Sequence, residues 1–115
     1  MPNRADPAPA RHAPGAQLAD VFFALGDATR LRLIEVLSAG GVFSITQLTA
    51  NTAISRQAVT KHLQMLADAG LVRDLRIGRE RLWQFDPSGG AKARRSLESI
   101  GRQWQRSLAN RKSSA

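Results

Sequence analysis

The chain has 115 residues, which is enough for one compact domain with a modest core and leaves little room for a second. Seventeen Lys and Arg against nine Asp and Glu give a net charge of +8, which favours a polyanionic partner such as nucleic acid or an anionic membrane surface. Because there is no cysteine, disulfides, thiolate zinc sites and cysteine nucleophiles are excluded.

The apolar pattern indicates neither a membrane span nor a signal sequence. The longest apolar run, residues 21–25, is far too short to cross a bilayer, and the Pro-, Ala- and Arg-rich start has no signal-peptide core. We therefore expect a cytoplasmic protein. Residues 1–14 hold four of the five prolines and almost no large apolar side chain, which predicts a disordered N-terminal arm.

Helical spacing of apolar residues predicts two helices after the arm. The apolar face of the first helix, which ends at Gly26, contains Leu18, Val21, Phe22 and Leu25. Asp27 is placed to cap the second helix, and Gly40 and Gly41 end it. The predicted apolar stripe of this second helix contains Leu31, Ile34 and Leu37.

The next elements predict a helix-turn-helix motif. Residues 42–45 indicate a lone strand, and residues 46–51 a short helix. After a tight turn at 52–54, Ser55 is a good N-cap for a longer helix that Gly70 ends. The inward stripe of this longer helix contains Val59, Leu63 and Leu66. A short helix, a tight turn and a longer capped helix are the parts of a DNA-binding helix-turn-helix.

A hairpin and a final helix complete the predicted order. Residues 71–77 and 81–86 alternate apolar and polar side chains and are joined by residues 78–80, which predicts two antiparallel strands. Residues 87–90 (PSGG) break the pattern, after which helical spacing resumes at Ala93, Leu97, Ile100, Trp104 and Leu108. The fold class is therefore mainly α with a small β-hairpin (α+β). We expect a winged helix-turn-helix domain over residues 15–112, with about five helices plus a two-stranded wing.

The longer helix of the motif carries a polar stripe opposite its apolar one. The residues that we predict to contact DNA from this helix are Ser55, Arg56, Gln57, Thr60, Lys61 and Gln64. Arg56 and Gln57 suit paired hydrogen bonds to guanine and adenine edges in the major groove, and Lys61 suits phosphate. The alternative interpretation is that these are ordinary solvated side chains. DNA contact is favoured over it because the sequence also predicts a wing and has an excess of basic residues.

Three arginines lie on or beside the predicted hairpin tip. Gly78 would let Arg79 reach a narrow minor groove, so we expect Arg79 to contact DNA. Arg76 and Arg81 are also predicted contacts, although keeping an edge strand soluble would account for each of them about as well.

The segments ALGDATRLRLIEVLS (residues 24–38) and ISRQAVTKHLQMLADAGLV (residues 54–72), together with the Arg-rich hairpin ending in LWQF, resemble the ArsR family of repressors over roughly residues 17–110. This resemblance implies a homodimeric repressor that binds double-stranded DNA at an inverted-repeat operator. It also implies pairing of the first and last helices across a twofold axis. The residues that we predict at the dimer interface are Leu18, Val21, Phe22, Leu97, Ile100, Trp104 and Leu108. The alternative is that the last helix folds back on its own core.

The resemblance does not extend to the metal sites of the family. Metal-sensing members place two thiolates at the start of the first helix of the motif, where this chain has Ser44 and Thr46. A second family site uses Asp, His and Glu on the last helix, where Glu98 is the one acid and no histidine occurs. For His62 we expect packing or a phosphate contact. We therefore expect no metal and no cofactor, and an effector, whether a small molecule or a protein, stays open.

Other classes of function fit less well. The two histidines and scattered acids suggest no paired catalytic site, so we do not expect an enzyme. RNA binding or protein interaction would suit the same fold, but all six aromatic residues fall on stripes assigned to the core or the dimer. Attachment to a membrane surface through Trp104 and Leu108 remains an alternative to DNA binding, although we expect no membrane partner.

Overall fold

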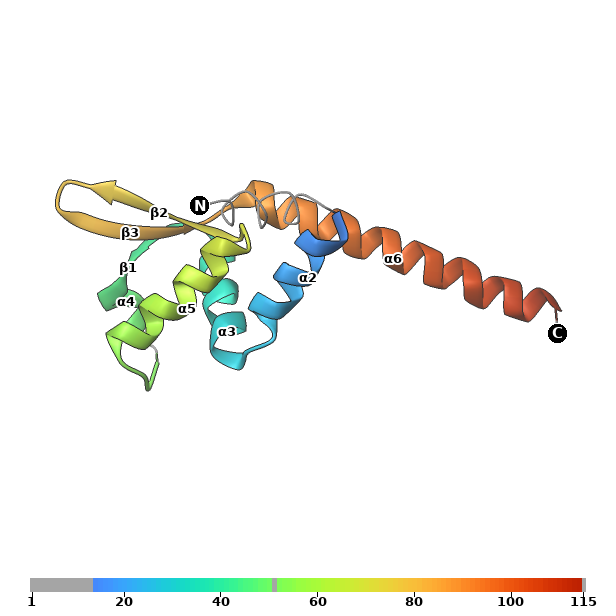
Figure 1. Cartoon of the computed structure of the whole chain (residues 1–115), viewed down its shortest axis with the longest axis horizontal. Coiled ribbons are helices and arrows are strands. Elements are labelled where there is room, and N and C mark those ends of the chain that lie inside the picture. Colours follow the sequence, from blue (N-terminus) through green and yellow to red (C-terminus); the bar gives the residue numbers. More distant parts are fainter. Residues whose placement is uncertain (1–13, 51, 115) are drawn as a thin grey trace, which may run out of the picture.

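The protein is described here by a computed structural model that places residues 14–50 and 52–114. In chain order (Figure 1) its elements are α2 (Pro14–Leu25), α3 (Ala28–Ser38), β1 (Val42–Ser44), α4 (Ile45–Thr49), α5 (Arg56–Asp68), β2 (Val72–Ile77), β3 (Glu80–Phe85) and α6 (Pro87–Ser114). The predicted fold class is confirmed. The predicted arm lies outside the described residues except at Pro14, where α2 begins.

The helix-turn-helix is formed by α4 and α5, and local capping sets where each begins. Ser44 and Gln47 form a capping box, in which the Ser44 hydroxyl accepts from the Gln47 N–H and the Gln47 side chain accepts from the Ser44 N–H. The box starts α4 at Ile45, one residue earlier than predicted. The Ser55 hydroxyl accepts from the Ala58 N–H at 3.1 Å and caps α5 as predicted.

The end of α5 is a Schellman motif. Gly70 has a φ of +80°, and the N–H groups of Gly70 and Leu71 donate to the carbonyls of Ala67 and Leu66. Leu66 and Leu71 are both buried, so the turn is also held by an apolar contact. The prediction that Gly70 ends the helix is confirmed, and the turn directs the chain into β2.

The core joins the helices to the inner face of the sheet. Its largest fully buried side chains are Trp83, Leu37, Leu63, Leu66 and Val59, so the predicted inward stripe of α5 is confirmed. The predicted stripe of α3 was wrong at Leu31, which is 45% exposed. Leu37 is buried as predicted, and the other buried residues of this helix are Arg30 and Leu33. Because the buried face of α3 begins with an arginine, Arg30, the spacing of apolar residues alone does not reveal it.

The lone strand predicted at residues 42–45 is not alone. β1 pairs antiparallel with β3, which places Phe43 opposite Trp83, and β2 pairs with the other edge of β3. The sheet therefore has three strands in the order β1-β3-β2 rather than the predicted two. Figure 1 shows the β2–β3 hairpin projecting from the helices, with β1 beside its base.

The start of α6 also differs from the prediction. The helix begins at Pro87 and runs straight through the two glycines that were expected to interrupt it. A Cβ on Gly89 would lie only 1.7 Å from the carbonyl oxygen of Gly70, and one on Gly90 would meet the ring of Phe85. These glycines therefore permit a close approach of α6 to the end of α5 and to β3.

Asp27 caps α3, and the cap lowers the pKa of its carboxyl group. Its carboxylate accepts from the Arg30 N–H at 3.1 Å, and this bond, together with the charge of Arg30, holds its pKa below the ordinary value. Because the pKa is lower in the folded than in the unfolded state, the ionised group stabilises the fold above its unfolded-state pKa. This stabilisation is lost as the pH falls through the folded-state pKa.

We expect Asp27→Asn to lower Tm at neutral pH, because asparagine preserves the cap but not the charge. The difference from the parent protein should shrink to nothing as the pH falls through the pKa of Asp27. Thermal unfolding followed by circular dichroism over a pH series measures this. A difference in Tm that did not change with pH would contradict a contribution from the ionised carboxylate.

Candidate nucleic-acid interface

The outer face of α5 presents a row of polar side chains. Arg56, Gln57, Lys61 and Gln64 are exposed, while Val59 and Leu63 on the opposite face are fully buried. With Ile45, Ala58 and Thr60, the four exposed side chains line a shallow, open depression. The structure therefore brings these predicted DNA-contacting residues together on one surface.

Hydrogen bonds divide the six predicted contacts on α5 into two groups. The Ser55 hydroxyl is used by the helix cap, and the Thr60 hydroxyl donates to the Arg56 carbonyl at 2.9 Å. The Arg56 guanidinium donates to the Thr46 hydroxyl at 3.0 Å, which links α5 to α4. Helical spacing alone does not predict this partner of Arg56. Gln57, Lys61 and Gln64 are exposed, and their side chains make no hydrogen bond within the described part of the chain.

The wing holds its three predicted arginines differently. Arg76 and Arg79 are exposed, and Arg79 follows Gly78, whose φ of +63° makes the turn. Arg81 donates from Nε to the Asp74 carboxylate at 2.9 Å, and its guanidinium lies 4.6 Å from the centre of the Trp83 ring. Arg81 is therefore engaged within the sheet, whereas Arg76 and Arg79 are available at the surface.

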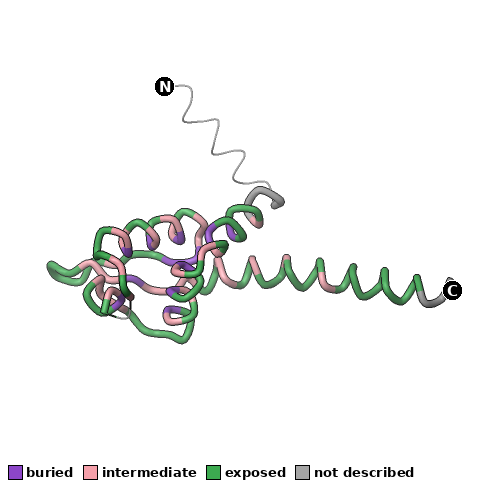
Figure 2. Tube along the Cα trace, turned by 90° about the horizontal axis from the view of Figure 1, so that it is seen from below, coloured by how far each residue is buried: buried purple, intermediate pink, exposed green. Residues whose placement is uncertain are grey.

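An apolar surface lies on α2 and α6. Phe22, Leu97, Ile100, Trp104 and Leu108 are between 44% and 68% exposed. Of the remaining predicted interface residues, Leu18 is half-buried, and Val21 is only 7% exposed because it packs in the core of its own chain. Figures 1 and 2 show α6 running outward from the domain with most of its length exposed, so this helix does not fold back on the core.

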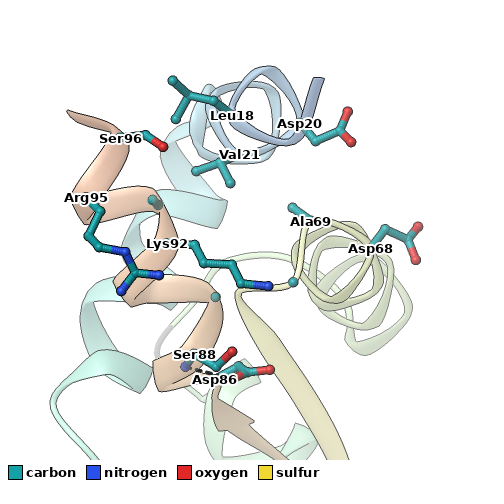
Figure 3. A pocket seen from close by; sticks show the side chains of 13 residues that line it. Leu18, Asp20, Val21, Asp68, Ala69, Asp86, Ser88, Lys92, Arg95 and Ser96 are labelled. Carbon is teal, nitrogen blue, oxygen red and sulfur yellow. Dashed lines mark hydrogen bonds between the residues drawn. The ribbon is translucent and has the colours of Figure 1, made fainter. Parts of the chain in front are cut away.

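A cavity of about 470 Å³ lies where α2, the end of α5 and the start of α6 meet (Figure 3). Its apolar lining includes Leu18, Val21 and Ala93. The charged side chains that line it are Asp20, Asp68, Asp86, Lys92 and Arg95. No cluster of three or more potential metal ligands occurs among the described residues. Within the same residues, no helix combines the length and apolar character needed to span a bilayer.

Known proteins are similar to this chain in both sequence and fold. A family model described as a helix-turn-helix domain matches residues 25–74. The HTH-type transcriptional regulator Rv2034 of Mycobacterium tuberculosis is 40% identical over 85 residues, which cover 74% of this chain and 76% of the relative. An ArsR-like transcriptional regulator from Rhodococcus sp. RHA1 is 39% identical, with a TM-score of 0.76 over 87% of this chain and 93% of that one.

A more distant structure shares the fold alone. The homodimeric winged helix-turn-helix domain Mb0332 (fragment 1–100) from Mycobacterium bovis is 22% identical, with a TM-score of 0.58 over 82% of this chain and 83% of that one. Taken with the exposed face of α5, the fold and the relatives define a winged helix-turn-helix DNA-binding protein that regulates transcription. The chain belongs to the ArsR family of transcriptional regulators, as the sequence resemblance implied.

Proposed function

We propose that the protein is a homodimeric repressor that binds an inverted-repeat operator in double-stranded DNA. The observation that carries this proposal is the exposed polar face of α5, whose other face is anchored in the core. A helix held in this way can enter the major groove without losing its packing.

Each surface residue then has a proposed part in DNA binding. Arg56 and Gln57, at the start of α5, read base edges, and Lys61 and Gln64 contact bases or phosphates further along the groove. Ser55 and Thr60 contribute through the capped first turn that they stabilise. Arg79 reaches the minor groove from the wing tip and Arg76 contacts the backbone, while Arg81 chiefly holds the wing in shape.

Dimerisation is supported by the apolar surface on α2 and α6. Exposed Phe22, Ile100 and Trp104 would be covered by the same residues of a second copy. The M. bovis domain of the same fold is described as homodimeric. Two α5 helices related by a twofold axis would meet successive major grooves about 34 Å apart, which is why we propose an inverted-repeat operator.

We propose that this regulator does not sense metals. The Ser44 hydroxyl caps α4, and the Thr46 hydroxyl accepts from Arg56, so both side chains have structural partners where metal-sensing relatives carry thiolates. The cavity between α2, α5 and α6 is a candidate site for a small-molecule effector, because it adjoins the proposed dimer surface.

The operator itself tests the base-reading role. Genomic fragments bound by the purified protein are sequenced, and affinities are measured for the selected duplex and for a scrambled one. We expect Arg56→Ala and Gln57→Ala each to weaken binding to the selected duplex by about 1–3 kcal/mol and to relax base preference. Lys61→Ala should weaken binding to both duplexes equally. Equal losses on both duplexes for Arg56→Ala would refute base reading by this residue.

A further inference from the structure

Arg30 is the one charged residue that is buried in the described part of the chain. Its guanidinium bonds first to the end of α2, where Nε donates to the Ala24 carbonyl at 2.6 Å and one terminal nitrogen donates to the Phe23 carbonyl at 3.4 Å. These carbonyls belong to the last turn of α2, where helix carbonyls carry partial negative charge, and the Phe23 carbonyl also accepts from the Gly26 N–H. The Arg30 side chain therefore caps the C-terminus of α2.

The other terminal nitrogen of Arg30 contacts α5. It lies 3.2 Å from Nδ1 of His62 and 3.4 Å from the Met65 sulfur. Arginine has only donors, so His62 accepts at Nδ1 and carries its proton at Nε2. The charged groups that face His62 are Arg30 and Asp27, whose carboxylate is 3.9 Å from Nδ1. His62 directly follows Lys61 in α5, so this contact lies next to the row of polar side chains that is proposed to face DNA.

The burial of the Arg30 guanidinium is not explained by a gain in folding stability. Taking a cation out of water is costly, and apolar side chains of similar volume often replace buried charges without loss of stability. Directional hydrogen bonds to two helices do something that apolar packing does not, because they set the angle and register of one helix against the other. Arg30 is therefore suited to align α5 with α2.

We propose that Arg30 is a positioning residue for α5, acting through His62. It fixes the orientation of α5 relative to α2, and thus the direction in which Arg56 and Gln57 meet the bases. Base contacts demand geometry within about 0.5 Å, whereas phosphate contacts tolerate small rotations. This inference rests on the proposed function for its effect on DNA, but the helix alignment can be measured without DNA.

The test uses two matched pairs of variants in the full chain. Arg30→Met and Arg32→Met each remove one arginine from α3, but Arg32 is exposed. His62→Leu removes the acceptor for Arg30, whereas the His62→Gln side chain can still accept. Residual dipolar couplings measured by NMR report the orientation of α5 relative to α2 in each variant. The ratio of affinities for the selected and scrambled duplexes reports selectivity.

We expect Arg30→Met and His62→Leu to rotate α5 relative to α2 and to lower the affinity ratio about tenfold, as losing one base contact would. Arg32→Met and His62→Gln should change neither. An unchanged helix orientation in His62→Leu, or an equal change in His62→Gln, would overturn the proposal. If the parent protein does not distinguish the two duplexes, the proposed function fails, and the couplings alone decide the positioning role.

Discussion

Trp104→Glu is expected to yield monomers that bind the selected operator about a hundredfold more weakly than the parent protein. Trp104 is the most exposed residue of the apolar stripe on α6, at 68%, and is not part of the buried core. In the proposed dimer the new carboxylate would be buried without a partner, which is costly. Losing the dimer removes the gain from engaging two half-sites together. Sedimentation equilibrium and a binding titration measure the two effects.

Gln103→Glu is the matched control for this variant. It adds the same charge at the neighbouring position, which is exposed and lies about 100° around the helix from Trp104. We expect Gln103→Glu to remain dimeric. An intact dimer in Trp104→Glu would remove this tryptophan from the interface, and a monomeric Gln103→Glu would point to a general effect of charge on α6.

Gly89→Ala is expected to destabilise the fold by about 1–3 kcal/mol or more, as overpacking does elsewhere. The added Cβ would lie 1.7 Å from the Gly70 carbonyl oxygen and 2.7 Å from its carbon, both of which are backbone atoms in the turn that ends α5. A rotamer change cannot relieve this contact, so α6 must shift away from α5. Chemical denaturation gives the free energy of unfolding.

Gly101→Ala separates this effect from the general influence of glycine in a helix. A Cβ at Gly101 meets nothing within 4 Å in its own chain, so we expect alanine there to stabilise α6 of the monomer by about 0.5–1 kcal/mol. Opposite signs for two identical substitutions in one helix would locate the constraint at the contact with Gly70. A neutral Gly89→Ala would show that α6 does not approach α5 as closely as described.

Local sequence patterns were sufficient to predict much of the fold. The caps at Asp27 and Ser55 and the stop at Gly70 depend on hydrogen bonds within a few residues, so they were predictable from neighbouring side chains. The exposed face of α5 followed from helical spacing in the same way. The strand that pairs with β1 and the α5 partners of Arg30 were not predictable, because they lie more than 30 positions away in the sequence.

The sequence by itself determined the order of the helices and strands, the helix-turn-helix and the polar face that α5 turns outward, since each depends on periodicity and short-range capping. Only the tertiary structure decided which of these residues have partners. It placed Arg30 between two helices, engaged Arg81 with Asp74 and Trp83, buried Val21, and required glycine at position 89. These outcomes depend on contacts between elements, and a one-dimensional pattern of polarity does not contain the distances between them.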